Sequence, residues 1–318
     1  MFRLRLVPDD TKIPFMRGRH AGLILSALLS LASVILFFHP GLNYGIDFRG
    51  GIVIEARTPA PADFTQLRHT LNALNMGQVA LQEFGSPQDV LIRLERQPGD
   101  DAAQQVAADK VRATLAKEIP GTTVRRVEAV GASVSSELFF NGMLALGLAA
   151  VAMLIYIWFR FEWQFGVGAV VTMLLDVTKI VGFYAITGMQ FNLTAIAAIL
   201  TIMGYSINDK VVVYDRMREN LRIYKKMPLR ELIDRSINET LNRTLGTSMC
   251  TLLSIIPLAL FGGEALEDFG IVLIFGIFLA TSSSIFIAAP ILLFLGENRL
   301  RRGAPAEAAS AGPEPQSP

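Results

Sequence analysis

The chain has 318 residues, 52% of them hydrophobic, and a formal net charge of +1. This apolar fraction is high for a soluble domain, and a near-neutral charge without a basic stripe excludes the usual electrostatic footprint of a nucleic-acid-binding protein. The single cysteine, Cys250, excludes an intrachain disulfide, and three widely separated histidines (His20, His39 and His69) do not predict a zinc site. No GxxxxGK[ST] loop is present, so energy must come from an ion gradient or a partner. We expect neither a cofactor nor an enzymatic activity.

The N-terminal segment 1–20 is polar and basic, and an apolar run, AGLILSALLSLASVILFF, follows at 21–38. A basic flank before an apolar run is also typical of a signal peptide. The run is long for a signal core, however, and HPGLNYG after it is a poor cleavage site. We therefore favour an uncleaved first membrane helix.

Residues 39–138 contain no run long enough to cross a membrane, and their pattern predicts a folded α+β domain. Strands are expected at 51–57, 79–84, 89–97 and 122–130, and helices at 61–75 and 101–119, with a turn at GSPQ, 85–88. The helix faces are Phe64, Leu67, Leu71 and Leu74 in the first, and Ala103, Val106, Ala107, Val111 and Leu115 in the second. The order β-α-β-β-α-β favours a ferredoxin-like sandwich over an α+β domain of other topology.

Five further apolar blocks of membrane-spanning length follow, at 139–159, 165–187, 191–213, 244–261 and 269–295. One connector, 214–243, is long, and its apolar stripe predicts an amphipathic helix after Pro228. That helix would lie either on the membrane surface or against a partner protein. The tail 303–318 is rich in Ala, Pro, Gly and Ser, and we expect it to be disordered. The fold class is thus a six-helix membrane protein with one small external α+β domain.

Lysine and arginine predict the orientation of these helices. They number five in segment 1–20, eight in 214–243 and three in 299–302, whereas the short opposite loops have none. Both termini are therefore expected in the cytoplasm. The domain at 39–138 would then lie outside, which in a bacterium means the periplasm.

Charged and polar side chains interrupt two of the predicted membrane helices. Asp176 and Lys179 lie at i,i+3 near the middle of the third helix, so they share a face and can neutralise each other. In the fourth helix, Ser206 and Asn208 are expected as supporting polar groups, with Asn208 hydrogen-bonding to another helix. Lys210 can snorkel to the cytoplasmic headgroups.

Asp209 is too short to snorkel, so it requires a partner on another helix or a water-filled cavity. Arg243, at the cytoplasmic end of the fifth helix, is the best candidate partner. A carboxylate between the opposing influences of burial and a nearby cation can take up and release protons, as a proton relay requires. Structural ion pairs that merely hold the bundle together remain the alternative.

Six motifs in the same order resemble the SecF family of protein-export membrane subunits. They are GLNYGIDFRGG (41–51, with Gly45, Asp47, Gly50 and Gly51), RFEW (160–163), the block 187–222 around SINDK, LNRTLGTS (241–248), ALFGGEALEDF (259–269) and ATSSSIFIA (280–288). Together they cover about residues 1–302.

The resemblance implies a bacterial inner-membrane subunit that pairs with SecD and is similar to the resistance-nodulation-division type of proton-driven transporter. It implies assistance to the SecYEG channel and SecA motor in moving preproteins, coupled to the proton motive force, with YajC and YidC as further candidate partners. It also implies that Asp209, Arg243 and Asp176 belong to a proton pathway. The alternatives are half of a small-molecule or lipid exporter, and a non-conducting scaffold.

Several positions depart from the family pattern. Family members often have His-Asp where this chain has Leu175–Asp176, small or apolar residues at Lys179, and Ser or Thr at Lys210. An acidic residue is common in place of Gln190. These differences suggest that Asp176 is bound to Lys179 and is more structural than conducting.

Overall fold

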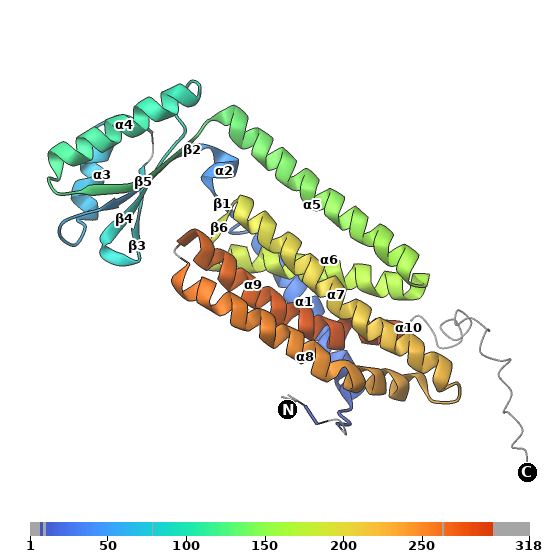
Figure 1. Cartoon of the computed structure of the whole chain (residues 1–318). Coiled ribbons are helices and arrows are strands. Elements are labelled where there is room, and N and C mark those ends of the chain that lie inside the picture. The colour runs from blue at the N-terminus through green and yellow to red at the C-terminus, as the bar shows by residue number, and fades with distance from the viewer. Residues whose placement is uncertain (1–6, 9–10, 78, 263, 295–318) are drawn as a thin grey trace, which may run out of the picture. The chain divides into compact units, whose positions relative to one another are not determined.

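The computed structural model describes residues 7–8, 11–77, 79–262 and 264–294, so the tail expected at 303–318 lies outside the described residues. Within these ranges, six helical segments are long and apolar enough to cross a membrane. The chain divides into two compact units (Figure 1). One, here the α+β unit, comprises 43–146 and 190–196; the other, the membrane unit, comprises 1–42, 147–189 and 197–318. Each is described by itself.

The α+β unit contains the predicted β-α-β-β-α-β order. The elements are β2 (Gly51–Arg57), α3 (Phe64–Asn72), β3 (Val79–Phe84), β4 (Ser86–Leu94), α4 (Asp101–Glu118) and β5 (Thr123–Val130). The sheet order is β3-β4-β2-β5 with antiparallel pairing throughout. This is the ferredoxin-like arrangement, with α3 and α4 against the sheet (Figure 1), so the predicted topology is confirmed.

Both helices of this unit pack against alternate residues of the central strands, because a strand turns every second side chain to one face. Ile52 and Ile54 of β2 meet Leu67 and Leu71 of α3, with Val111 and Leu115 of α4 in the same core. The predicted face of α4 is wrong at one position, since Val106 is 65% exposed. Gln104 lies inward instead and exchanges hydrogen bonds with the backbone of Gln97.

The turn predicted at 85–88 is tighter than expected. Strand β4 already begins at Ser86, so the reversal takes place around Gly85, whose φ of +70° is a conformation that glycine adopts without strain. The turn was predicted to extend over Ser86 and Pro87 because proline is rare in strands. Here Pro87 lies near the strand's start, where proline is tolerated.

The membrane unit is helical. Its elements are α1 (Arg19–Phe38), preceded by a 3-10 turn η1 (Phe15–Gly18); α6 (Trp163–Thr187); α8 (Leu229–Phe261); and α9 (Glu264–Ser283), which continues through a π-helical turn η2 (Ser284–Ala288) into α10 (Ala289–Phe294). Helices α5 (Ala132–Arg160) and α7 (Leu193–Ile223) each cross the boundary between the two units.

The helix predicted after Pro228 is confirmed, but the non-helical part of the connector expected at 214–243 is much shorter than predicted. Helix α7 continues to Ile223, and α8 begins at Leu229 directly after Pro228, a residue compatible with a helix start but not with its interior. The apolar stripe after Pro228 is buried within the chain itself, so it covers neither a membrane surface nor a partner; it comprises Leu229, Leu232, Ile233, Ile237 and Leu241.

Ion pairs and rings fix the polar end of α7. Asp215 pairs with Arg160 at 2.5 Å, and Arg218 lies 3.8 Å from Glu162 in the connector before α6. Tyr214 packs edge-on against Phe165, with the ring centroids 5.2 Å apart. These contacts hold the C-terminal end of α7 in place, and they thereby fix the position along the helix axis of the α7 side chains that precede Tyr214.

Candidate functional site

A cluster of ionisable side chains is buried inside the membrane unit. Asp176 of α6 is 2% exposed, and its Oδ2 accepts hydrogen bonds from Lys210 Nζ of α7 at 3.0 Å, Ser206 Oγ at 2.8 Å and Ser283 Oγ at 2.7 Å. Lys210 is 1% exposed and also donates to Ser206 Oγ. Three helices thus meet at one carboxylate oxygen, a charge-assisted arrangement stronger than a neutral hydrogen bond.

Lys179 is the second cation of this cluster. Its Nζ lies 3.8 Å from Asp176 Oδ1, so the predicted i,i+3 ion pair is confirmed. The contact is the looser of the two, because neither Lys179 Nζ nor Asp176 Oδ1 has a hydrogen-bond partner among the described residues. Asp176 therefore belongs chiefly to Lys210.

The prediction that Lys210 snorkels toward the cytoplasm is wrong. In an α-helix the Cα–Cβ bond tilts toward the N-terminus, so a long side chain covers the preceding turn. In α7 that direction leads from Lys210 back toward Ser206 and the depth of Asp176. An ion pair lies there, whereas a snorkelling side chain would have to lean the other way.

Asp209, next to Lys210 on α7, is also buried, with 6% of its surface exposed. Ser284 of η2 and Thr244 of α8 lie close enough for their hydroxyls to act on its carboxyl, and the charge of Lys210 acts on it as well. Even so, Asp209 Oδ2 has no hydrogen-bond partner among the residues that the structure describes. Asp209 is therefore a buried carboxyl group with incomplete hydrogen bonding.

The predicted Asp209–Arg243 pair is not formed. Arg243 is exposed and makes no ion pair or hydrogen bond with any described residue. Helix α8 does approach Asp209, but it does so with the next residue, Thr244. Because adjacent helical residues point about 100° apart, the face that brings Thr244 inward carries Arg243 outward.

The prediction that Asn208 hydrogen-bonds to another helix is also wrong. It is exposed on α7 and makes no interhelical hydrogen bond within the described ranges, whereas Ser206 is confirmed as a supporting polar group. Nor do three His, Cys, Asp or Glu side chains gather as potential metal ligands in those ranges.

The π-helical turn η2 explains how one helix serves both carboxyl groups. Ser283, the last residue of α9, donates to Asp176 Oδ2, and Ser284, the first residue of η2, lies close enough to Asp209 for its hydroxyl to act on that carboxyl. Single π turns inside α-helices occur often at functional sites. Nothing in the spacing of the serines in ATSSSIFIA indicates a π turn.

Hydroxyl groups extend the polar interior beyond the cluster. Ser248 Oγ lies 2.8 Å from Tyr205 Oη and 2.9 Å from Thr281 Oγ1, which links α7, α8 and α9. Close helix contact accompanies these bonds, since a Cβ on Gly276 of α9 would collide with Ile202 of α7. Small and hydroxyl residues therefore bring the helices close enough for polar contacts.

The glycine-rich motif after α1 lies in the α+β unit. Strand β1 (Asn43–Tyr44) pairs in parallel with β6 (Gln190–Phe191), and Asp47 Oδ2, in the short helix α2 (Ile46–Arg49), accepts from the backbone N–H of Leu193 at 3.0 Å. Gly51 has a φ of +125°, and a Cβ there would lie 2.7 Å from the carbonyl oxygen of Leu94. The motif therefore anchors the first turn of α7.

Two family models match the chain. The model described as "Protein export membrane protein SecD/SecF, C-terminal" covers residues 110–298, and the "SecD/SecF GG Motif" covers residues 35–58. The second range contains the glycine-rich motif, and the first contains the buried cluster.

Relatives with assigned names agree with these models. The chain is 43% identical over 303 residues to "Protein translocase subunit SecF" of Rickettsia bellii, covering 95% of this chain and 99% of that one. It is 44% identical to part of "Protein translocase subunit SecDF" of Brucella abortus, covering 92% of this chain and 38% of that protein.

A solved structure shows the same fold. The crystal structure of SecDF from Thermus thermophilus superposes with a TM-score of 0.82 at 33% identity, over 92% of this chain. The chain spans 40% of the length of that SecDF protein. Fold, motif order and sequence identity agree: the chain is a multi-pass membrane protein that belongs to the SecD/SecF family of protein-export membrane proteins.

Proposed function

We propose that this chain is a SecF-type subunit that works with SecD to assist Sec-dependent protein export and couples that work to the proton motive force. The relative from Rickettsia bellii, named a protein translocase subunit, matches the chain over nearly its whole length. In the SecDF relatives one polypeptide contains a region like this chain and a longer remainder, which supports a SecD-type partner for this chain.

The observation that carries the proton coupling is the buried set of four charged residues on α6 and α7. Asp176, Lys179, Asp209 and Lys210 are each no more than 6% exposed, within helices that are long and apolar enough to cross a membrane. Ionisable groups at such depth are costly and mark ion or proton pathways in membrane proteins. With all four groups ionised, the two carboxylates and the two ammonium groups give zero net charge.

In this proposal Asp209 carries the exchangeable proton. Asp176 forms ion pairs with two lysines, whereas Asp209 forms no ion pair with a described residue. When Asp209 takes up a proton, one uncompensated positive charge remains in a medium of low dielectric constant. Because an unpaired buried charge is strongly unfavourable, the helices that carry the four groups have a reason to rearrange or to admit water.

The proposed orientation completes the mechanism. Both termini lie in the cytoplasm of a bacterial inner membrane, and the α+β unit lies in the periplasm, where an emerging preprotein would meet it. SecYEG and SecA are the proposed translocation partners, with YajC and YidC as further candidates.

The experiment that tests the coupling is Asp209→Asn, which is nearly isosteric but cannot ionise. Preprotein export into inverted membrane vesicles containing SecD would be measured with and without the proton gradient. We expect Asp209→Asn to lose the stimulation by the gradient while export driven by ATP hydrolysis continues. The matched control is Asp109→Asn on the exposed face of α4, which should behave as wild type.

Two results would contradict the proposal in different ways. If Asp209→Asn keeps full dependence on the gradient, Asp209 is not the relay, and the subunit is better described as a scaffold. If deletion of the whole subunit leaves export unchanged, the translocase role itself fails.

A further inference from the structure

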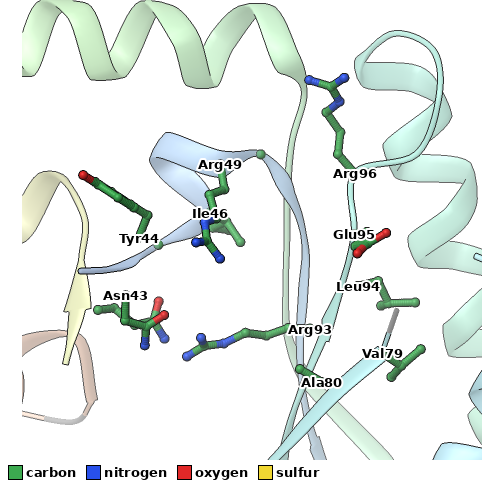
Figure 2. A pocket seen from close by; sticks show the side chains of 13 residues that line it. Asn43, Tyr44, Ile46, Arg49, Val79, Ala80, Arg93, Leu94, Glu95 and Arg96 are labelled. Atoms are coloured by element: carbon green, nitrogen blue, oxygen red, sulfur yellow. The ribbon is translucent and has the colours of Figure 1, made fainter. Parts of the chain in front are cut away.

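A second candidate binding site lies in the α+β unit, apart from the buried cluster. It is a cavity of about 550 Å³ at the glycine-rich motif, lined among others by Asn43, Tyr44, Arg49, Arg93, Arg96 and Gln190 (Figure 2). Figure 2 shows that Arg49 and Arg93 turn their guanidinium groups toward the side occupied by Asn43 and Tyr44, while Arg96 extends separately. Nothing in the proposed proton coupling uses these residues.

The charge of this cavity is strongly one-sided. Three arginines line it, against one acidic residue, Glu95. The Glu95 carboxylate lies against Gly77, which is not part of the cavity wall. Neither Arg49 nor Arg96 forms an ion pair with a described residue, and Arg49 instead sits 6.0 Å from the centre of the Tyr44 ring. The cavity therefore favours an anion.

The cavity also adjoins the ends of two membrane-crossing segments. Gln190 lines it, and the apolar span Leu193–Ile223 begins three residues later. Gly50 lines it as well, and a Cβ on Gly50 would lie 3.3 Å from Ser135 Oγ in the first turn of the span Ser133–Arg160. Three extended residues reach at most about 10 Å, and the headgroup layer is about 5–7 Å thick on each side of the hydrocarbon core. Gln190 in the cavity wall therefore lies within about 10 Å of the start of an apolar span, close to where lipid headgroups would meet that span.

We infer that this cavity binds the phosphate of an anionic phospholipid in the leaflet on the side of the α+β unit. A guanidinium group presents a planar set of donors that fits two phosphate oxygens at once. Arg49 and Arg93 hold the phosphate, Arg96 adds charge at the rim, and the side-chain amides of Asn43 and Gln190 offer neutral donors for the glycerol hydroxyls. A choline headgroup fits less well, because its quaternary ammonium would face the guanidinium groups.

The test uses the full-length protein and native mass spectrometry. The protein in a neutral detergent is titrated with short-chain phosphatidylglycerol, short-chain phosphatidylcholine or inorganic phosphate. We expect one phosphatidylglycerol to bind with at least about tenfold higher affinity than phosphatidylcholine. The double variant Arg49→Gln/Arg96→Gln should weaken phosphatidylglycerol binding by at least about tenfold, because it removes one hydrogen bond between charged groups and one positive charge at the rim.

The control is Arg68→Gln/Arg112→Gln, which removes two arginines of α3 and α4 that do not line the cavity; it should bind phosphatidylglycerol as wild type does. Equal loss in both double variants would show that only net charge matters and would overturn the site. Equal affinity for the two lipids would also overturn it. Inorganic phosphate that binds alone and displaces phosphatidylglycerol at equal concentration would mean a free-phosphate site and overturn the lipid assignment. Thermal unfolding of each variant checks that it is folded.

Discussion

Two carboxylates in the two units have almost the same partners but different surroundings. Asp89 in the α+β unit accepts two hydrogen bonds from Arg57 at 2.7 Å and one from Ser86 at 2.7 Å, with Arg125 at 3.4 Å. Asp176 in the membrane unit also has two cations around it, but two hydroxyls in place of one. The cations differ in exposure: 42% and 46% of the arginine side chains are accessible, against 4% and 1% of the lysine side chains.

The difference in surroundings decides what each group does. The Arg57 guanidinium, with help from the Ser86 hydroxyl and then Arg125, holds the pKa of Asp89 at about 2, and solvent near the arginines screens any imbalance of charge. Around Asp176 no solvent is available to compensate, so each change of charge acts on the packing itself. A carboxylate with cations and hydroxyls around it thus holds strands together where its cations are exposed, and makes the packing sensitive to charge where its cations are buried.

The largest expected effect comes from removing the charge of the buried carboxylate, Asp176. Asp176→Asn removes the carboxylate that pairs with Lys210 and Lys179, and we expect a loss of about 3–5 kcal/mol in the free energy of unfolding. Thermal unfolding in detergent micelles measures it. The double variant Asp176→Asn/Lys210→Met should recover part of the loss, and an Asp176→Asn protein as stable as wild type would contradict the account.

A smaller effect separates the two lysines. Lys210→Met removes the 3.0 Å hydrogen bond to Asp176 and should cost about 1.5–3 kcal/mol, the usual contribution of a hydrogen bond between charged groups. Lys179→Met should cost less, because Lys179 lies 3.8 Å from the carboxylate and makes no hydrogen bond to it. Unfolding midpoints of the two variants, measured side by side, test the ranking, and the reverse order would contradict it.

A third carboxylate, Asp47, lies at the start of the membrane helix α7 and is partly exposed. The expected effect of removing it is smaller than that of removing Asp176 and larger than that of removing Asp89. Its Oδ2 accepts from the Leu193 N–H, one of the four N–H groups that a helix leaves unpaired at its start. Asp47→Ala should therefore cost about 1 kcal/mol, as loss of a helix cap usually does. Hydrogen exchange should rise in the first turn of α7 and stay unchanged at Ile223. Uniform exchange along the helix would refute a capping role.

The smallest effect is expected at Asp89, and it depends on pH. A carboxyl group with a pKa near 3.9 in the unfolded chain and about 2 in the fold stabilises the fold above about pH 4. That contribution is lost as the pH falls through about 2. Hydrogen exchange of β2 and β4 in wild type should therefore approach that of Asp89→Asn between pH 4 and pH 2. Curves that stay parallel would contradict the assignment.

Much of the fold was predictable because its signals are local. Strand β2 was expected at 51–57 and lies there, since GIVIEAR is a β-branched run bounded by glycine and threonine. The six membrane-crossing helices follow from apolar length alone. The extended ends of α7 and α8 could not be read in the same way, because the burial of Leu232 and Ile237 depends on tertiary contacts.

The site was predictable in its residues but not in its pairing. Asp176, Lys179, Asp209 and Lys210 were singled out by the cost of charge in an apolar run. The Asp176–Lys210 contact is consistent with distances along the two helices from the connection between α6 and α7, because Lys210 reaches back one turn to the level of Ser206. Asp176 lies eleven residues before the end of α6, and Ser206 lies thirteen residues after the start of α7, which is about 17 and 20 Å from the short connection. The Arg243 assignment was wrong because the helix after Pro228 and the fifth membrane span were predicted as separate helices. In the continuous helix α8, the buried face that contains Leu241 continues to Thr244, not to Arg243.

The π turn at Ser284–Ala288 has a consequence for sequence comparison. A π turn contains one more residue than the α turn that it replaces, so the apolar faces before and after it are out of phase by about 100°. Relatives without this turn should show a one-residue deletion here and, in an ungapped alignment, a face of α10 that no longer matches. A single-residue gap near position 284 would then distinguish two lineages of the sixth helix, and would separate those that present adjacent serines to two carboxylates from those that do not.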